Sequence, residues 1–134
     1  MRKFALALIA MLALVPAASF AHGNMKPQHG GVVQMSGETV FELVVKPASV
    51  ELYVSEDDDA VAPADATANL VITVGGKETD VPMSAGANNG FVAQTTLSKG
   101  ASVGVVVKYK NGSKTFTTYT LRTEHEFSGV TRTP

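Results

Sequence analysis

Residues 103–122 read VGVVVKYKNGSKTFTTYTLR, and this stretch decides the fold class. Its first half places large side chains at every second position: Val103, Val105, Val107 and Tyr109. Such alternation puts these side chains on one face of a β-strand. Residues 115–122 are rich in β-branched and aromatic types, which favour strands. Asn111-Gly112 lies between the two halves and is a strong signal for a two-residue turn with φ > 0 at both positions. The stretch therefore predicts an antiparallel hairpin.

The same pattern recurs along the chain before this hairpin. Residues 39–46, 50–55 and 70–74 also alternate, and beyond the N-terminal leader no stretch long enough for a helix shows helical periodicity. Turn signals such as Gly75-Gly76 separate these runs at intervals of mostly about 8–12 residues, the spacing of sandwiches and barrels. No βαβ pattern is present, so a parallel sheet is not expected. We expect an all-β, immunoglobulin-like antiparallel β-sandwich of seven or eight strands.

One segment, EDDDAVAPADATA at 56–68, interrupts this rhythm. Its acidic head and Pro63 predict an exposed connection that crosses between the sheets. The acidic run lacks the ligand spacing and the glycine of a calcium-binding loop. We therefore interpret it as a solvated acidic loop.

The N-terminus has the features of a secretory signal peptide. Arg2 and Lys3 precede an apolar run at 4–15, and small residues before His22 suit a signal-peptidase site after Ala21. A retained membrane anchor is the alternative, although the run is short for a membrane span. We expect a signal peptide at 1–21, a His/Met-containing segment at 22–31, a sandwich domain at 32–123 and a C-terminal tail at 124–134. We accordingly expect a periplasmic or otherwise exported protein that is not inserted in a membrane after cleavage.

Composition limits the function classes that fit the mature chain. Removing 21 of the 134 residues leaves 113, and removing Arg2 and Lys3 leaves 9 basic residues against 12 acidic ones, a net charge of about −3. This weak acidity argues against nucleic acid and anionic membrane surfaces as partners. The chain has no cysteine, so a metal site must use histidine, methionine, carboxylate or backbone ligands. No catalytic motif such as G-x-S-x-G or H-E-x-x-H is present, and we expect no enzyme activity.

His22 becomes the N-terminal residue if cleavage follows Ala21. Its α-amine and the ring nitrogen nearer the backbone can then chelate one metal ion, because a metal can displace their protons near neutral pH. One further histidine would complete a three-nitrogen copper site, called a histidine brace. The alternative is a cleavage junction that happens to precede a histidine.

Three other residues are candidate ligands. His29 is the natural second histidine, and Gly30-Gly31 after it would let the backbone approach an ion; alternatively, His29 is a strand-entry residue bonded to backbone. Met25 offers a thioether, which favours Cu(I). His125 lies between two glutamates after the last predicted strand, either as a ligand near the N-terminal segment or as a solvated tail residue. His22 and His29 share an ion only if the chain folds back, because seven extended residues span roughly 23–25 Å.

The stretch HGNMKPQHGGVVQ at 22–34 resembles a family of small exported bacterial proteins, and segments of heavy-metal efflux adaptors. These begin with a His/Met-containing leader and a P-x-H-G-G element that leads into a strand ending in F/L-E-L-V. The matching residues are Pro27, 29–31 and 41–44. More loosely, an N-terminal histidine on a small β-sandwich is similar to CopC-type periplasmic copper-binding proteins. That resemblance implies a copper carrier and transfers His22 alone as a ligand.

The leading hypothesis is therefore a copper carrier or buffer in metal homeostasis or resistance, with zinc as the alternative metal. His22 would chelate, His29 would be the second ligand and Met25 a soft third. The runner-up is a β-sandwich without a metal of its own that docks through its strand edges on an envelope or efflux partner. A brace-type copper oxidase is a third hypothesis.

Overall fold

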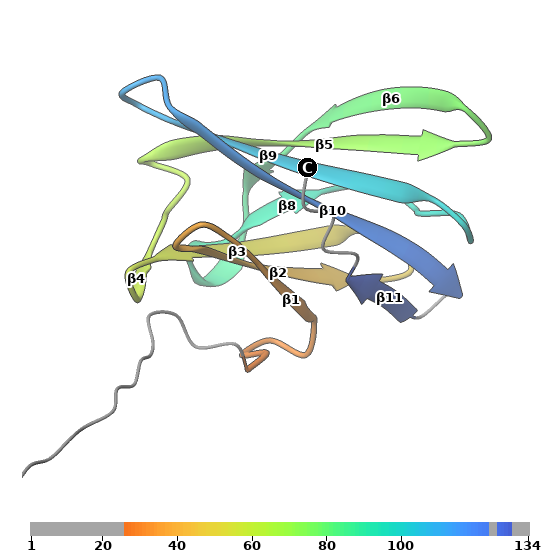
Figure 1. The fold of residues 1–134 in the computed structure, drawn as a ribbon, viewed down its shortest axis with the longest axis horizontal. Coiled ribbons are helices and arrows are strands. Elements are labelled where there is room, and N and C mark those ends of the chain that lie inside the picture. The colour runs from red at the N-terminus through yellow and green to blue at the C-terminus, as the bar shows by residue number, and fades with distance from the viewer. Residues whose placement is uncertain (1–25, 124–125, 130–134) are drawn as a thin grey trace, which may run out of the picture.

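The computed structural model describes residues 26–123 and 126–129, which form two antiparallel β-sheets packed face to face (Figure 1). The first sheet has the order β1 (Val32–Ser36), β2 (Thr39–Val45), β3 (Val50–Glu56), β8 (Phe91–Ala93) and β7 (Ser84–Ala85), with β4 (Asp59–Ala60) also paired to β3. The second has the order β11 (Glu126–Gly129), β10 (Lys114–Thr123), β9 (Ser102–Tyr109), β5 (Ala66–Val74) and β6 (Lys77–Pro82). A short 3₁₀ turn, η1 (Ala87–Asn89), precedes β8.

The strand order confirms the immunoglobulin-like sandwich. In that fold one sheet holds strands A, B, E and D, and the other holds G, F and C, with C′ added in variable-type domains. In the first sheet, the places of strands A, B, E and D are taken by β2, β3, β8 and β7. In the second, the places of G, F, C and C′ are taken by β10, β9, β5 and β6. β1 and β11 each add an outer strand. Among the described residues, eight strands have four or more residues and three are shorter, so the predicted number matches the longer strands.

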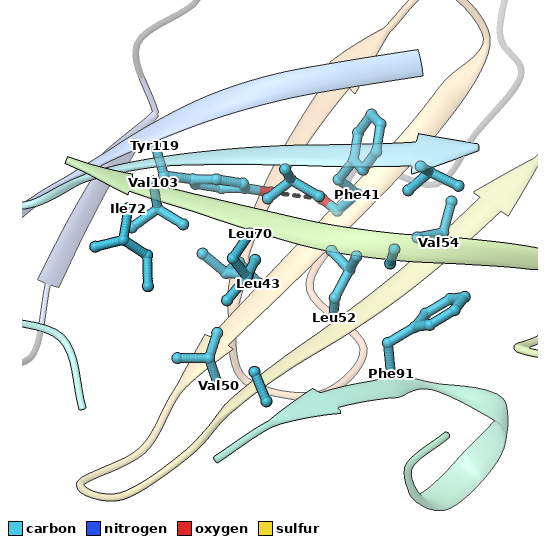
Figure 2. Close-up of a cluster of buried hydrophobic side chains, with 14 of the residues drawn as sticks. Phe41, Leu43, Val50, Leu52, Val54, Leu70, Ile72, Phe91, Val103 and Tyr119 are labelled. Carbon is cyan, nitrogen blue, oxygen red and sulfur yellow. Dashed lines mark hydrogen bonds between the residues drawn. The ribbon is translucent and has the colours of Figure 1, made fainter. Parts of the chain in front are cut away.

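The core lies between the sheets and consists of the alternating side chains expected from the sequence. Figure 2 shows part of it, with Phe41, Leu43 and Leu52 from the first sheet facing Leu70, Val103 and Tyr119 from the second. The Tyr119 hydroxyl is shared by the backbone carbonyls of Val32 and Phe41, at 3.2 and 3.1 Å. Burial raises the pKa of Tyr119, so this hydroxyl stays protonated.

A buried side chain joins the sheets on the side where β1 lies beside β10. Gln34 of β1 donates from Nε2 to the carbonyl of Thr118 at 2.7 Å, and the Thr117 hydroxyl donates to its Oε1 at 3.3 Å. On the opposite side, β6 and β7 are the edge strands. β6 carries Lys77, Glu78, Asp80 and Pro82, residues that discourage pairing with another strand.

The turns agree with the sequence in one hairpin and differ in another. Both residues of Gly75-Gly76 have positive φ, 56° and 82°, as a two-residue turn requires. Of the pair Asn111-Gly112, only Gly112 has positive φ. The Tyr109 amide donates to the Ser113 carbonyl, so the β9–β10 loop has three residues, and the expectation of a two-residue turn is wrong there. A type I turn followed by a left-handed glycine is the usual form of such a loop.

The predictions for the 56–68 connection, the C-terminal tail and the signal peptide compare differently with the structure. The 56–68 stretch does cross between the sheets, since β4 belongs to the first and β5 to the second. β11 lies within the range predicted as a C-terminal tail, so the second sheet continues past residue 123. The predicted signal peptide at 1–21 lies outside the described residues. No helix among the residues that the structure describes is long and apolar enough to cross a membrane.

Candidate functional site

The candidate site lies on the outer face of the first sheet, over β2 and β3. Val40, Glu42 and Val44 of β2 point away from the core, because Phe41 and Leu43 point into it. Outward positions on a sandwich are normally solvated, yet Glu42 is only 5% exposed. Residues 26–31 approach this face, and Glu42 binds their backbone. The outer face of β2 is therefore a second contact surface, made by the N-terminal segment.

The Glu42 carboxylate holds this segment in place with four hydrogen bonds. Its Oε1 accepts from the Gln28 amide at 3.0 Å and lies 3.0 Å from Nδ1 of His29. Its Oε2 accepts from the amides of His29 and Gly31, both at 2.8 Å. Both oxygens of one buried carboxylate therefore fix the path of residues 28–31.

Glycines at 30 and 31 allow the segment to lie this close to β2. Gly30 has φ +79°, a conformation that other residues rarely adopt. A Cβ atom on Gly31 would collide with the carbonyl oxygen of Leu43 and lie 2.8 Å from Cγ2 of Val44. The sequence predicted that these glycines bring the backbone near an ion. The structure shows a different close approach, to the neighbouring strand.

The electrostatics of Glu42 determine the state of the His29 ring. Burial raises the pKa of Glu42, but the hydrogen bonds from the His29 ring and from three backbone amides outweigh burial, so the net pKa is lowered. Glu42 is therefore ionised at neutral pH and can only accept hydrogen bonds. Its neighbour Nδ1 must then carry a proton, and in the neutral ring Nε2 holds the lone pair. No hydrogen bond to this Nε2 is found among the described residues.

Tyr53 of β3 supports the His29 ring from one side. The two rings are stacked, with centroids 3.5 Å apart and an interplanar angle of 3°. The pairing of β2 with β3 places Tyr53 directly opposite Glu42, so one register positions both partners of the histidine. The Tyr53 hydroxyl donates to Glu51 at 3.0 Å, and Lys46 binds the other oxygen of Glu51 at 2.9 Å.

The loop before β8 leaves little room for the Tyr53 ring to move. A Cβ on Gly90 would lie 2.5 Å from Cε1 of Tyr53. The absence of that atom lets the Gly90 backbone lie against the ring. Burial, followed by the hydrogen bond to Glu51, raises the pKa of Tyr53, so its hydroxyl remains a donor.

His29 and Tyr53 line an open cleft of about 260 Å³. Its floor is apolar, with Val33 and Val40, and its rim includes Lys26, Asp58 and Asn88. Two left-handed turns border it: Asp57-Asp58 between β3 and β4, and Asn88-Asn89 before β8, with φ from 52° to 68°. Non-glycine residues seldom adopt these angles, although Asn and Asp tolerate them best. The rim is thus built from tightly constrained turns.

The predicted metal ligands are only partly placed by the structure. His29 is described, whereas His22, Met25 and His125 lie outside the described residues. Within the described ranges, no three histidine, aspartate or glutamate side chains come together as a metal-holding group. Whether His125 approaches the N-terminal segment stays a prediction. β1 contacts β10 and β11, the two strands that precede and follow residues 124–125 in the sequence.

Sequence reasoning did not single out Glu42 or Tyr53 as site residues. A usable signal was present in β2, where Val40 and Val44 are apolar at outward positions. Apolar residues on both faces of a strand indicate that both faces are covered. A lone carboxylate between them is then a candidate for a buried, hydrogen-bonded group.

Comparisons with known proteins add little to this geometry. The sequence matches no protein-family model and no curated protein. Among solved structures, a Br derivative of BhCBM56 is similar at 14% identity and a TM-score of 0.41, over 77% of this chain and 100% of that one. A similarity at this level carries no argument about function.

Proposed function

We propose that the protein is an exported metal-binding protein that carries or buffers copper, with Nε2 of His29 as one ligand. The observation that carries this proposal is the 3.0 Å contact between Nδ1 of His29 and the buried carboxylate of Glu42. Histidines that bind metals commonly donate their other ring N–H to a carboxylate, which fixes the tautomer and makes the ligand nitrogen more basic. The side chain of His29 is 32% exposed, so an ion can reach it.

The remaining ligands are proposed from the residues just before the described segment. His22 is four positions before Lys26, which lines the same cleft as His29. Four extended residues reach about 13–14 Å, so His22 is close enough in sequence to fold back toward that cleft. An N-terminal His22 would supply an amine and a ring nitrogen, and Met25 would supply a thioether. His125 is a further candidate. For nitrogen ligands the Irving–Williams order favours Cu(II) over Zn(II), which supports copper as the cargo and leaves zinc as the alternative.

Export is part of the same proposal. The basic, apolar and small-residue regions of 1–21 support secretion through a cleaved signal peptide. Cleavage also creates the free amine of His22, so secretion and metal binding depend on the same bond. The proposal places the mature chain in the periplasm or another exported compartment.

Titration of the mature chain, beginning at His22, with Cu(II) and Zn(II) tests the proposal. Mass spectrometry reports the stoichiometry, and competition with a chelator reports the affinity. We expect one ion bound more tightly than micromolar, and a variant with Glu42→Gln that binds 10–100-fold more weakly, the usual effect of losing such a carboxylate. Glu78→Gln, an exposed glutamate on β6 of the other sheet, is the matched control and should bind normally.

The alternative outcomes are distinct. If the parent protein binds neither ion below micromolar concentrations, metal binding is excluded, and the Glu42–His29 contact only anchors the segment. That result would favour the non-metal interaction module. If His22→Ala binds as tightly as the parent, the N-terminal residue is not a ligand.

A further inference from the structure

A cluster of basic residues lies on the β9–β10 hairpin, away from the site at His29. Lys108, Lys110, Lys114 and Phe116 make up this patch, which we call the basic hairpin. All four residues are exposed. The three lysines make no ion pair with any residue that the structure describes. The patch stands out because the mature chain as a whole has a net charge of about −3.

Two of these lysines face each other across the hairpin. In the β9–β10 register Lys108 pairs directly with Lys114, and on its other side Lys108 pairs with Thr67 of β5. Like charges at opposed positions destabilise a sheet. None of the described residues forms an ion pair with either lysine, so a ligand that offsets this repulsion must be negatively charged.

Phe116 adds an apolar element to the same face. It lies two positions after Lys114 on β10, so their side chains share the outer face of the second sheet. It is 65% exposed, and the residue paired with it is Val106. An aromatic side chain beside lysines suits the boundary between charged headgroups and acyl chains.

The shape of the hairpin favours a flat partner. Residues 110–114 are all exposed, and Figure 1 shows the β9–β10 connection extending to one end of the sandwich. A projecting tip can touch a plane without the rest of the domain obstructing it. Lys108 and Lys110 also line an open hollow of about 320 Å³ beside Pro63 and Ala64, but Lys114 and Phe116 lie outside it. A partner that contacts the whole basic hairpin must therefore lie across its exposed face and not only in this hollow.

We propose that the basic hairpin docks the protein on a bilayer surface that contains anionic phospholipid. The lysines would lie among the phosphate groups, and Phe116 would enter the interface. The overall negative charge argues against such a surface for the protein as a whole, but it does not describe the charge of the basic hairpin. Screening limits charge effects to about 8–10 Å, so the local cluster decides. This inference is independent of the proposed metal site.

Co-sedimentation of the mature protein with vesicles tests the proposal. One set of vesicles contains phosphatidylglycerol and phosphatidylcholine, and the other contains phosphatidylcholine alone. We expect binding to the anionic set at low salt and its loss at high salt. Each lysine near such a surface contributes about a fivefold factor, so Lys108→Gln with Lys114→Gln should weaken binding about thirtyfold. Phe116→Ser should weaken it several-fold with little change in salt dependence.

A matched pair of substitutions separates local from total charge. Lys77→Gln with Lys99→Gln removes the same charge from exposed lysines outside the hairpin and should leave vesicle binding nearly unchanged. The Lys108/Lys114 double variant should also melt no lower than the parent, because it relieves a repulsion. Equal binding by the two double variants, equal binding to both sets of vesicles, or binding to polyglutamate without vesicle binding would each overturn the proposal.

Discussion

Replacing Glu42 by Gln should release the N-terminal segment from the sandwich while the core stays folded. The carboxylate accepts four hydrogen bonds, two at each oxygen. An amide keeps one accepting oxygen and turns the other position into a donor that faces at least one backbone N–H. At least one of the four bonds is therefore lost, and those that remain lose their charged acceptor. A hydrogen bond to a charged group contributes about 1.5–3 kcal/mol, and solvent reaches part of the segment, so we expect a loss of about 2–4 kcal/mol.

Amide hydrogen exchange measures this loss where it occurs. The amides of Gln28, His29 and Gly31 should exchange about 30- to 700-fold faster in the variant, up to the rate of an unprotected amide. Amides of β9, in the core of the second sheet, should be unaffected. Glu51→Gln is the control, because Glu51 lies on the same face but binds only side chains. Unchanged exchange at residues 28–31 in the Glu42 variant would refute the assignment of Glu42 as the anchor.

Three further predictions address pH, packing and the core. The folded pKa of Glu42 is lowered, so its stabilisation is complete above the ordinary value of 4.5 and is lost as the pH falls through the lowered pKa. Protection of the segment against exchange, relative to the intrinsic rate at each pH, should therefore fall only in acid. A loss of protection with a midpoint near pH 6 would contradict this. Gly90→Ala should displace the Tyr53 ring and lower the free energy of unfolding by about 1–3 kcal/mol. It should also reduce the ring-current shift of the His29 ring protons in the NMR spectrum. An unchanged shift would count against the stacking of the two rings. Tyr119→Phe should lower the free energy of unfolding, measured in urea, by about 1–2 kcal/mol, because two backbone carbonyls lose their donor. A loss below roughly 0.3 kcal/mol would show that this hydroxyl contributes little to stability.

The sandwich could be predicted because its signals are local. Alternation along 103–109 identifies the face that β9 buries, and the turn glycines mark where strands end. What the sequence did not provide was the loop geometry, since Asn111-Gly112 is compatible with loops of two or three residues. β11 was also not predicted, because a four-residue strand at a sheet edge has little pattern of its own.

The site could be predicted only in part, because it depends on contacts distant in sequence. His29 was identified from its own motif. Its partners Glu42 and Tyr53 are 13 and 24 positions away, and they meet it only through the register of β2 with β3 and the fold-back of residues 26–31. A shift of that register by one residue would place Glu42 and Tyr53 on opposite faces of the sheet. No local pattern specifies such a register.

The central claim is that a metal ion binds Nε2 of His29 while Nδ1 donates to Glu42. The most direct test is the ¹⁵N spectrum of the His29 ring in the mature protein, with and without one equivalent of Cu(I) or Zn(II), both diamagnetic. The account predicts that the Nε2 resonance shifts on metal addition and that the Nδ1–H signal persists. An Nε2 resonance that does not move while the ion is bound, or a metal bound at Nδ1 with the Glu42 contact broken, would contradict it.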